Sequence, residues 1–141
     1  MTAKVTYADV SDGEELKPWT YKVERMNLVM YAGASGDFNP IHWSPEFAKM
    51  VGLPDTIATG MHTMAKLGQF ITDWCGDPGA VVRFSNRFTM PIVVPFEGGA
   101  EVTIKGRVME KLDGNKVRVQ IEAESPEGTN VSKGEAVVQL A

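Results

Sequence analysis

Residues 59–74 read Thr-Gly-Met-His-Thr-Met-Ala-Lys-Leu-Gly-Gln-Phe-Ile-Thr-Asp-Trp, and this segment decides the fold. Its apolar and small residues recur at helical spacing and form a broad stripe. The stripe comprises Met61, Met64, Ala65, Leu67, Gly68, Ile71 and Trp74. A helix with so wide an apolar face has to be buried against another element. The segment therefore predicts a buried helix that begins at Gly60.

Four segments with strand character follow this helix and provide that element. They are residues 80–90, 100–110, 116–125 and 131–140, in which apolar and polar residues alternate. Alternation gives each strand one apolar and one solvated face, so the strands predict an antiparallel sheet with one face to cover. Asp113-Gly114 predicts a hairpin turn between the second and third of these strands. The pattern predicts an α+β domain in which the sheet wraps the helix.

The residues at the N-terminal end predict shorter elements. We expect an extended arm over residues 1–15, a first strand over 17–23 and a short helix over 24–34. The apolar residues of that short helix recur at helical spacing; they are Met26, Val29, Met30 and Ala34. The helix leads into a polar loop.

A further helix is expected after that loop. Ser44 is suited to be its N-cap, and Pro45 and Glu46 suit its first turn. We expect this helix to extend to about residue 51, with Phe47 and Met50 facing inward.

The composition limits the class of protein. At 141 residues, 43% hydrophobic and 23% charged, the chain is expected to form one domain over 1–141. A net charge of −4 argues against non-specific binding to nucleic acid or an anionic membrane. We expect a cytoplasmic protein, because the sequence has neither a leader-like start nor a membrane-spanning apolar run.

Metal and thiol chemistry are not expected. The two histidines, His42 and His62, lack the spacing of a metal-binding motif. The single cysteine, Cys75, cannot form an internal disulfide and has no histidine close to it in sequence, so we do not expect it to be a nucleophile.

Residues 31–42, Tyr-Ala-Gly-Ala-Ser-Gly-Asp-Phe-Asn-Pro-Ile-His, place three polar side chains in a loop between glycines and a proline. An imidazole, with a reference pKa of roughly 6.5, can carry protons in both directions, and a carboxylate can orient or assist it. Asp37 and His42 therefore suggest acid/base catalysis. The structural alternative is an Asx turn at Asp37 or Asn39, followed by a histidine bonded to a backbone carbonyl.

The words Ala-Gly-Ala-Ser-Gly-Asp-Phe-Asn-Pro-Ile-His at 32–42 and Thr-Gly-Met at 59–61 resemble the signature of MaoC-like (R)-specific enoyl-thioester hydratases and dehydratases. The similarity extends over nearly the whole chain. Residues 31–64 and 74–88 most resemble the catalytic B subunit of (3R)-hydroxyacyl-carrier-protein dehydratase. The resemblance implies the hot-dog fold, in which an antiparallel five-stranded sheet wraps a central helix.

The resemblance also implies an activity that needs no cofactor: reversible dehydration of (3R)-3-hydroxyacyl thioesters and hydration of trans-2-enoyl thioesters. Asp37 and His42 match the catalytic positions, although the sequence does not indicate which of them transfers which proton. Asn39 would shape the loop or hold the water. Gly60 would supply the oxyanion site, because the first amides of a helix lack partners there and favour negative charge. The alternative is a plain helix start with Thr59 as N-cap.

Two residues depart from the family pattern on either side of Gly60. Thr59 stands where most relatives have histidine, and His62 stands where they have an apolar residue. Both are candidates for substrate binding, although for His62 a structural role is the preferred interpretation. Arg83 and Arg87 lie four apart on one predicted strand and hence on the same face, where they could bind phosphates of the thioester carrier. The alternative for this pair is a solvated strand face.

The expected partners follow from the resemblance. The substrate would be an acyl-CoA or acyl-carrier-protein thioester, and the chain would form a homodimer or a heterodimer with a related hot-dog subunit. Two other functions stay open at this point. One is an acyl thioesterase, since hot-dog proteins include these enzymes, and the other is an acyl-binding subunit that is active only with a partner chain.

Overall fold

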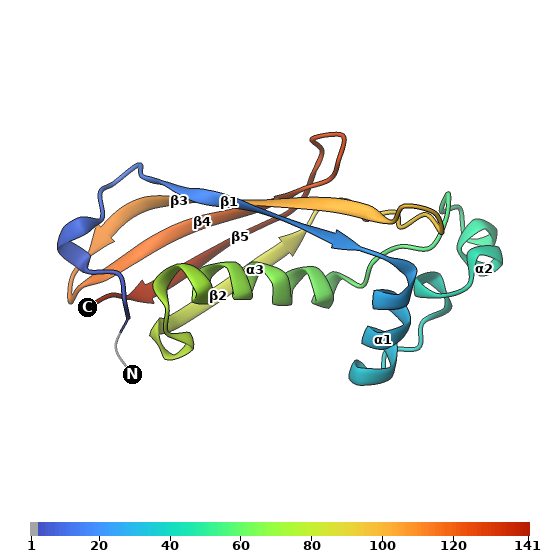
Figure 1. The fold of residues 1–141 in the computed structure, drawn as a ribbon, viewed down its shortest axis with the longest axis horizontal. Helices are drawn as coiled ribbons and strands as arrows, with labels where there is room; N and C mark the ends of the chain where they lie inside the picture. The colour runs from blue at the N-terminus through green and yellow to red at the C-terminus, as the bar shows by residue number, and fades with distance from the viewer. Residues whose placement is uncertain (1–2) are drawn as a thin grey trace.

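Residues 3–141, which the computed structural model describes, contain five strands that form one antiparallel sheet in the order β1-β3-β4-β5-β2 (Figure 1). The strands are β1 (Glu15–Val23), β2 (Val81–Phe88), β3 (Ala100–Leu112), β4 (Lys116–Glu124) and β5 (Asn130–Gln139). The helices are α1 (Arg25–Ser35), α2 (Pro45–Met50) and α3 (Gly60–Cys75), with the 3₁₀ turns η1 (Tyr7–Asp9), η2 (Pro40–His42) and η3 (Pro78–Ala80).

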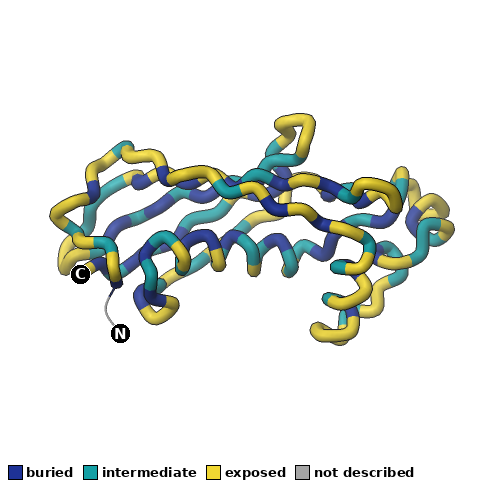
Figure 2. The backbone as a smooth tube through the Cα atoms, in the orientation of Figure 1, coloured by how far each residue is buried: buried dark blue, intermediate teal, exposed yellow. Residues whose placement is uncertain are grey.

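The sheet curves over α3, as the amphipathic pattern of that helix predicts (Figure 1). The buried residues of α3 are Thr63, Leu67, Phe70, Ile71 and Cys75. They face the buried residues of the sheet, which in β3 and β4 alternate with exposed or half-buried ones (Figure 2). Full burial of a side chain such as Leu67 stabilises the fold by roughly 1.5–3 kcal/mol. The expected α+β hot-dog fold is confirmed.

Gly106 shows how closely β3 approaches the helix. A Cβ atom added at this position would lie 2.7 Å from the Phe70 ring, which is closer than carbon atoms can come without a shift. Glycine at this point in β3 therefore allows Phe70 to pack directly against the strand backbone.

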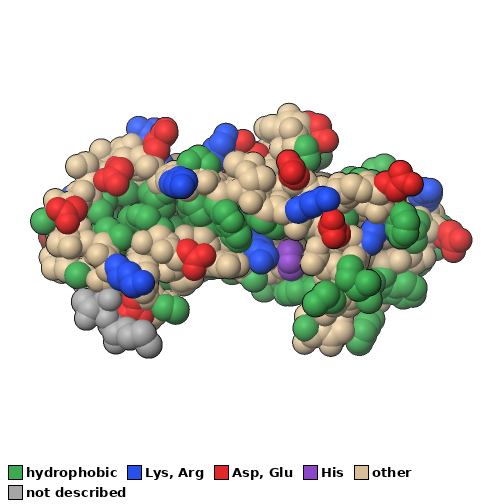
Figure 3. All heavy atoms as spheres, in the orientation of Figure 1, with side chains coloured by type: hydrophobic (Ala, Val, Ile, Leu, Met, Phe, Trp, Pro, Cys, Tyr) green, Lys and Arg blue, Asp and Glu red, His purple; other side chains and the backbone are tan. Residues whose placement is uncertain are grey.

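The segment between β1 and α3 forms a lobe at one end of the molecule (Figure 1). In this lobe α1 buries Leu28 and Ala32, whereas Met26, Val29 and Met30 are exposed by 65%, 56% and 64%. The helical spacing of the exposed residues was predicted correctly, but their shared face is uncovered. Hydrophobic side chains accordingly gather on the surface over α1 and α2 (Figure 3).

Helix α2 corrects one prediction. Ser44 accepts a hydrogen bond from the Phe47 amide at 3.3 Å, so its role as N-cap is confirmed. The inward orientation expected of Met50 is wrong, because its side chain is 73% exposed. In this six-residue helix the buried residue is Ala48.

The N-terminal arm is less extended than expected, although Met1 and Thr2 lie outside the described residues. The turn η1 interrupts it. The Lys4 amide donates to the Cys75 carbonyl at 2.7 Å and the Tyr7 amide donates to the Ala141 carbonyl at 2.9 Å, which ties the arm to the C-terminal ends of α3 and the chain. Within residues 3–141, no helix has the length and hydropathy needed to cross a membrane.

Candidate functional site

Helix α1 ends immediately before the polar loop. Gly36 adopts a left-handed conformation with φ of 74°, and its amide donates to the Ala32 carbonyl at 2.9 Å, which closes the helix. The hydroxyl of Ser35 donates to the Tyr31 carbonyl at 2.7 Å. The same hydroxyl oxygen accepts the Asp37 amide at 3.2 Å. The last turn of α1 therefore fixes the backbone at Asp37.

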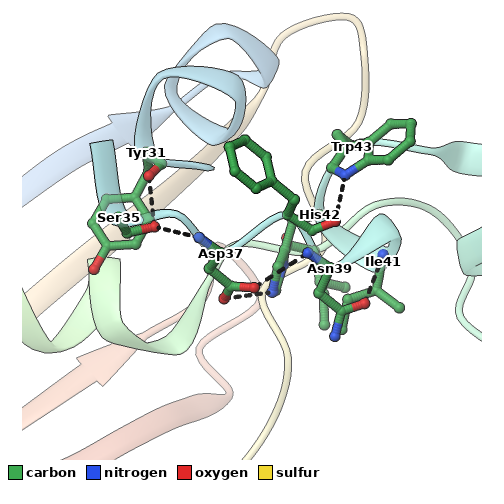
Figure 4. A network of polar contacts seen from close by, with 9 residues as sticks. Tyr31, Ser35, Asp37, Asn39, Ile41, His42 and Trp43 are labelled. Carbon is green, nitrogen blue, oxygen red and sulfur yellow. Dashed lines mark hydrogen bonds and ion pairs between the residues drawn. The ribbon is translucent and has the colours of Figure 1, made fainter. Parts of the chain in front are cut away.

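Two successive Asx turns shape the loop itself (Figure 4). The Asp37 Oδ1 atom accepts the Asn39 amide at 3.2 Å, and the Asn39 Oδ1 atom accepts the Ile41 amide at 3.3 Å. These turns are the structural alternative considered for the loop, and both are present. They do not occupy the second carboxylate oxygen of Asp37, which points toward His42.

The imidazole of His42 is buried and has a fixed orientation. Its Nδ1 atom lies 2.8 Å from the carbonyl oxygen of Ile57, and a carbonyl can only accept. Nδ1 must therefore carry the hydrogen, which leaves an unprotonated Nε2 in the neutral ring. That Nε2 atom lies 3.8 Å from Asp37 Oδ2.

The separation of 3.8 Å is too long for a direct hydrogen bond between the two side chains. Both atoms are acceptors when the ring is neutral and the carboxyl group is ionised. One water molecule, with two hydrogens to donate, can satisfy both of them at once. The arrangement can therefore hold a water and remove a proton from it.

The N-terminus of α3 lies at the same site. The Thr59 carbonyl accepts the amides of His62 and Thr63 at 3.0 and 3.3 Å, so Thr59 precedes the helix as expected. Its side chain makes no capping bond, however, and its Oγ1 atom is buried without a hydrogen-bond partner among residues 3–141. A Cβ added at Gly60 would lie 3.1 Å from the Phe88 ring, so the glycine backbone and this ring are in close contact.

A cavity of about 320 Å³ joins His42 to the start of α3. Its lining residues are His42, Ile57, Ala58, Gly60, Thr63, Phe88, Thr89, Met90, Pro91, Ile92 and Val131. Most of these are apolar, so the cavity combines two polar functions, an imidazole and a helix N-terminus, with a surface suited to a hydrocarbon chain. Asp37, with a side chain 44% exposed, approaches His42 from the solvent side.

His62 lies beyond the residues that line this cavity. Its ring packs edge-on against Tyr31 of α1, with centroids 5.4 Å apart, and it is tilted over Tyr21 of β1 at 6.3 Å. Burial, and secondly the charge of Lys66, lower the pKa of His62 below its ordinary value. Burial raises the pKa of Tyr21 to about 12. Binding of substrate by Thr59 and His62 remains a prediction.

Arg83 and Arg87 share a face, as their spacing predicts. They pair with Val137 and Lys133 of β5, whereas Phe84 between them pairs with the buried Ala136. Both arginines therefore project from the outer face of the sheet, away from α3. Arg87 borders a hollow of about 510 Å³ on that face, together with Arg118 and Lys133. The structure does not bring either arginine to the cavity at His42.

Metal binding and thiol chemistry find little support in the arrangement of the side chains. In the part of the chain that the structure describes, no group of three or more His, Cys, Asp or Glu side chains is arranged to hold a metal. Cys75 is buried, its Sγ donates to the Asp77 carbonyl at 3.3 Å, and burial raises the pKa of its thiol. A buried thiol with a raised pKa is a poor nucleophile.

The structure adds site residues that the sequence did not indicate. The Ile57 carbonyl orients His42, and the indole Nε1 of Trp43 donates to the Phe38 carbonyl at 2.9 Å across the loop (Figure 4). Met90 and Ile92 line the cavity. The sequence does not indicate these residues, because only folding brings the Ile57 and Phe38 carbonyls, and the Met90 and Ile92 side chains, to the site.

The sequence and fold match known proteins. A family model described as a MaoC-like domain matches residues 8–127. The 3-hydroxyacyl-thioester dehydratase X of Mycobacterium tuberculosis is 42% identical over 81 residues, which cover 57% of this chain and 28% of that protein. Fatty acid synthase 2 of Mycosarcoma maydis is 34% identical over 117 residues, or 77% of this chain and 3% of that protein. The chain thus spans a minor part of these curated relatives.

Solved structures show the same fold. A MaoC-like dehydratase superimposes with a TM-score of 0.93 at 36% identity, over 96% of this chain and 42% of that one. The R-hydratase PhaJ1 from Pseudomonas aeruginosa has a TM-score of 0.85 at 27% identity, over 99% and 87% of the chains. The HadBC complex of Mycobacterium tuberculosis, a (3R)-hydroxyacyl-ACP dehydratase, shares the fold, with a TM-score of 0.66 at 19% identity over 89% and 95%. Since the family model covers most of its length, this chain belongs to the MaoC-like domain family.

Proposed function

We propose that the chain catalyses the reversible dehydration of (3R)-3-hydroxyacyl thioesters and hydration of trans-2-enoyl thioesters. The observation that carries the proposal is the pair of acceptors formed by Asp37 Oδ2 and His42 Nε2, 3.8 Å apart beside a cavity that also contains Gly60. Relatives named as a 3-hydroxyacyl-thioester dehydratase and an R-hydratase support the same reaction.

In hydration, Asp37 and His42 hold a water beside C3 of the enoyl chain. One of the pair accepts a proton as the water oxygen bonds to C3, and the electrons of the C2=C3 bond move toward the thioester carbonyl. The pair then returns a proton to C2, so that its own protonation ends as it began. Dehydration follows the same steps in reverse.

The negative charge that develops on the carbonyl oxygen requires a second group. With that oxygen at Gly60, the free amides and dipole of α3 stabilise the charge, and the missing side chain lets the thioester approach. Donors of this kind contribute about 3–4 kcal/mol to lowering a barrier. Phe88, in contact with Gly60, would then lie along the path of the acyl chain.

Strand β2 lies at one edge of the sheet. We propose that a second hot-dog chain, identical or related, pairs with this edge. Phe88 and Met90, exposed by 47% and 54%, lie at the end of the edge and also line the cavity, so the partner would complete its wall. The two-chain HadBC complex supports such an assembly. Size measurement of the purified chain, alone and with candidate subunits, distinguishes homodimer from heterodimer.

Carrier binding and location remain predictions from the sequence. Arg83 and Arg87 would contact carrier phosphates only if the thioester arm reaches the outer face at β2. Their replacement by alanine would then raise KM for the carrier-bound substrate and leave kcat unchanged. A cytoplasmic location would be tested by fractionation of the source cells.

The activity is tested by incubating the purified chain with a short and a long trans-2-enoyl-CoA. We expect loss of enoyl absorbance, formation of the (3R)-hydroxyacyl product and no free thiol. Release of thiol without hydration would identify a thioesterase instead. A different result would identify a subunit that depends on its partner: the chain alone would bind acyl chains without turnover, and turnover would begin when a second hot-dog chain is added.

A further inference from the structure

His62 lies where α3, which begins at Gly60, meets α1, which leads to Asp37. It is two residues from Gly60 on α3, yet its ring faces Tyr31 of α1 and Tyr21 of β1 rather than the cavity. The contact with Tyr31 is edge-to-face, at an interplanar angle of 82°. Its Nδ1 atom is buried and has no hydrogen-bond partner among residues 3–141. The ring is therefore placed to act through packing.

Other contacts also hold helix α1 to the body of the protein. At its start, Arg25 forms an ion pair with Asp55 at 2.6 Å and donates from Nε to the Val94 carbonyl at 2.6 Å. Along its length the buried side chains are Leu28 and Ala32. The contact between Tyr31 and His62 joins the later half of α1 to α3.

The hydrogen bonds beyond Tyr31 lead to the backbone amide of Asp37 (Figure 4). The Tyr31 carbonyl accepts the Ser35 hydroxyl at 2.7 Å, and the Ser35 oxygen accepts the Asp37 amide at 3.2 Å. A continuous series of contacts thus connects α3, which carries Gly60, to the backbone of Asp37.

We propose that His62 is a positioning residue, which acts through Tyr31 and Ser35 to hold the Asp37 carboxylate in place relative to His42 and Gly60. This inference rests on the proposed function. Asp37 follows α1 and Gly60 begins α3, and both have to act on one substrate, so the distance between them must be fixed. The contact between Tyr31 and His62 joins the two helices near Asp37 and Gly60 and fixes that distance.

The sensitivity of the site to this contact follows from its geometry. Asp37 and His42 are 3.8 Å apart and have to share one water, so a small shift of α1 would let one of them lose it. A misplacement of about 1 Å can cost roughly 100-fold in rate. The neighbouring titratable groups are Tyr21, Tyr31 and Lys66. Burial, and secondly Lys66, lower the pKa of His62, which favours the neutral ring in these aromatic contacts.

The test compares variants of the full chain in the hydration assay. Wild type and His42→Ala are measured first, because absence of His42-dependent hydration would overturn the proposed function itself. Given that activity, His62→Ala and Ser35→Ala are each expected to lower kcat roughly tenfold, with KM changed less than twofold. His62→Phe keeps an aromatic ring without a titratable group and is expected to stay within threefold of wild type.

The double variant provides a sharper readout. If His62 and Ser35 belong to one series of contacts, His62→Ala combined with Ser35→Ala lowers kcat no further than either change alone. Trp19→Leu is the matched control, because it removes an aromatic contact with Tyr21, at 5.4 Å, that does not involve α1. It is expected to lower thermal stability and leave kcat unchanged.

Several results would overturn the proposal. If His62→Ala has the same kcat as Trp19→Leu, His62 contributes only ordinary packing. A raised KM with unchanged kcat would mean that His62 contacts substrate. Loss of activity in His62→Phe would mean that the imidazole itself is required. If His62→Ala does not fold, His62→Phe and Ser35→Ala still decide, because the proposal requires the first to be active and the second to be impaired.

Discussion

The Nδ1 atom of His42 lies 2.8 Å from the carbonyl oxygen of Ile57. This single contact determines which ring nitrogen is free, and Nε2 consequently faces Asp37. Because Ile57 is three residues before Gly60, the contact also ties the polar loop to the segment that leads into α3. The proposed acid/base groups and the helix N-terminus are thereby held together beside the cavity.

Gly60→Ala is expected to lower hydration activity tenfold or more, because the new Cβ would meet the Phe88 ring at 3.1 Å and occupy the approach to the first amides of α3. Steady-state kinetics with an enoyl-CoA substrate measure the effect. Gly68→Ala is the matched control on the same helix, since its Cβ would meet nothing within 4 Å. Equal activity of the two variants would remove Gly60 from the proposed mechanism.

Gly106→Ala is expected to reduce the free energy of unfolding by about 1–3 kcal/mol, because the Phe70 ring lies 2.7 Å from the added Cβ. Gly33→Ala, at a position on α1 where nothing lies within 4 Å, is expected to increase it by about 0.5–1 kcal/mol. Urea unfolding measures both changes. A neutral result for Gly106→Ala would show that β3 can move away from α3 at no cost.

Tyr21 makes the fold sensitive to alkaline pH. Its pKa is raised from 10.0 to about 12 by burial, so above pH 10 the unfolded chain releases a proton that the folded chain retains. The contribution of Tyr21 to stability is therefore fully present below pH 10 and is lost as pH rises toward 12. Its buried hydroxyl makes no hydrogen bond of standard geometry among residues 3–141, although the nearby Thr63 side chain partly offsets the rise in its pKa, so Tyr21→Phe should fold normally.

The measurement is the free energy of unfolding of wild type and Tyr21→Phe between pH 8 and 11. We expect the wild type to lose stability relative to the variant above pH 10. Parallel curves for the two proteins would contradict the burial of the phenol, and other alkaline effects cancel in the comparison.

The sequence predicts the sheet and central helix well because periodicity reports directly on burial. Leu67 and Ile71 on α3, and Val102 and Ile104 on β3, are all fully buried. Spacing shows which residues share a face, but it does not show what covers that face. For this reason the inward orientation predicted for Met50 is wrong, and its side chain is exposed.

The site was predictable where one short segment supplies its chemistry. Asp37, Asn39 and His42 lie in a single loop, and their side chains make the contacts that bring Asp37 and His42 together. The orientation of His42 depends instead on the carbonyl of Ile57, fifteen residues away, and no residue type marks that role. Likewise, spacing placed Arg83 and Arg87 on one face, but only the pairing of β2 with β5 shows that it is the outer one.

The central claim, that Asp37 and His42 act as a unit on one water, is tested most directly by a double-mutant cycle on enoyl-CoA hydration. Asp37→Asn and His42→Ala are each expected to lower kcat at least roughly 100-fold, and the double variant to be no slower than the worse single one. Circular dichroism of each variant confirms that the fold is intact. Full activity in either single variant, or losses that multiply in the double variant, would contradict the claim.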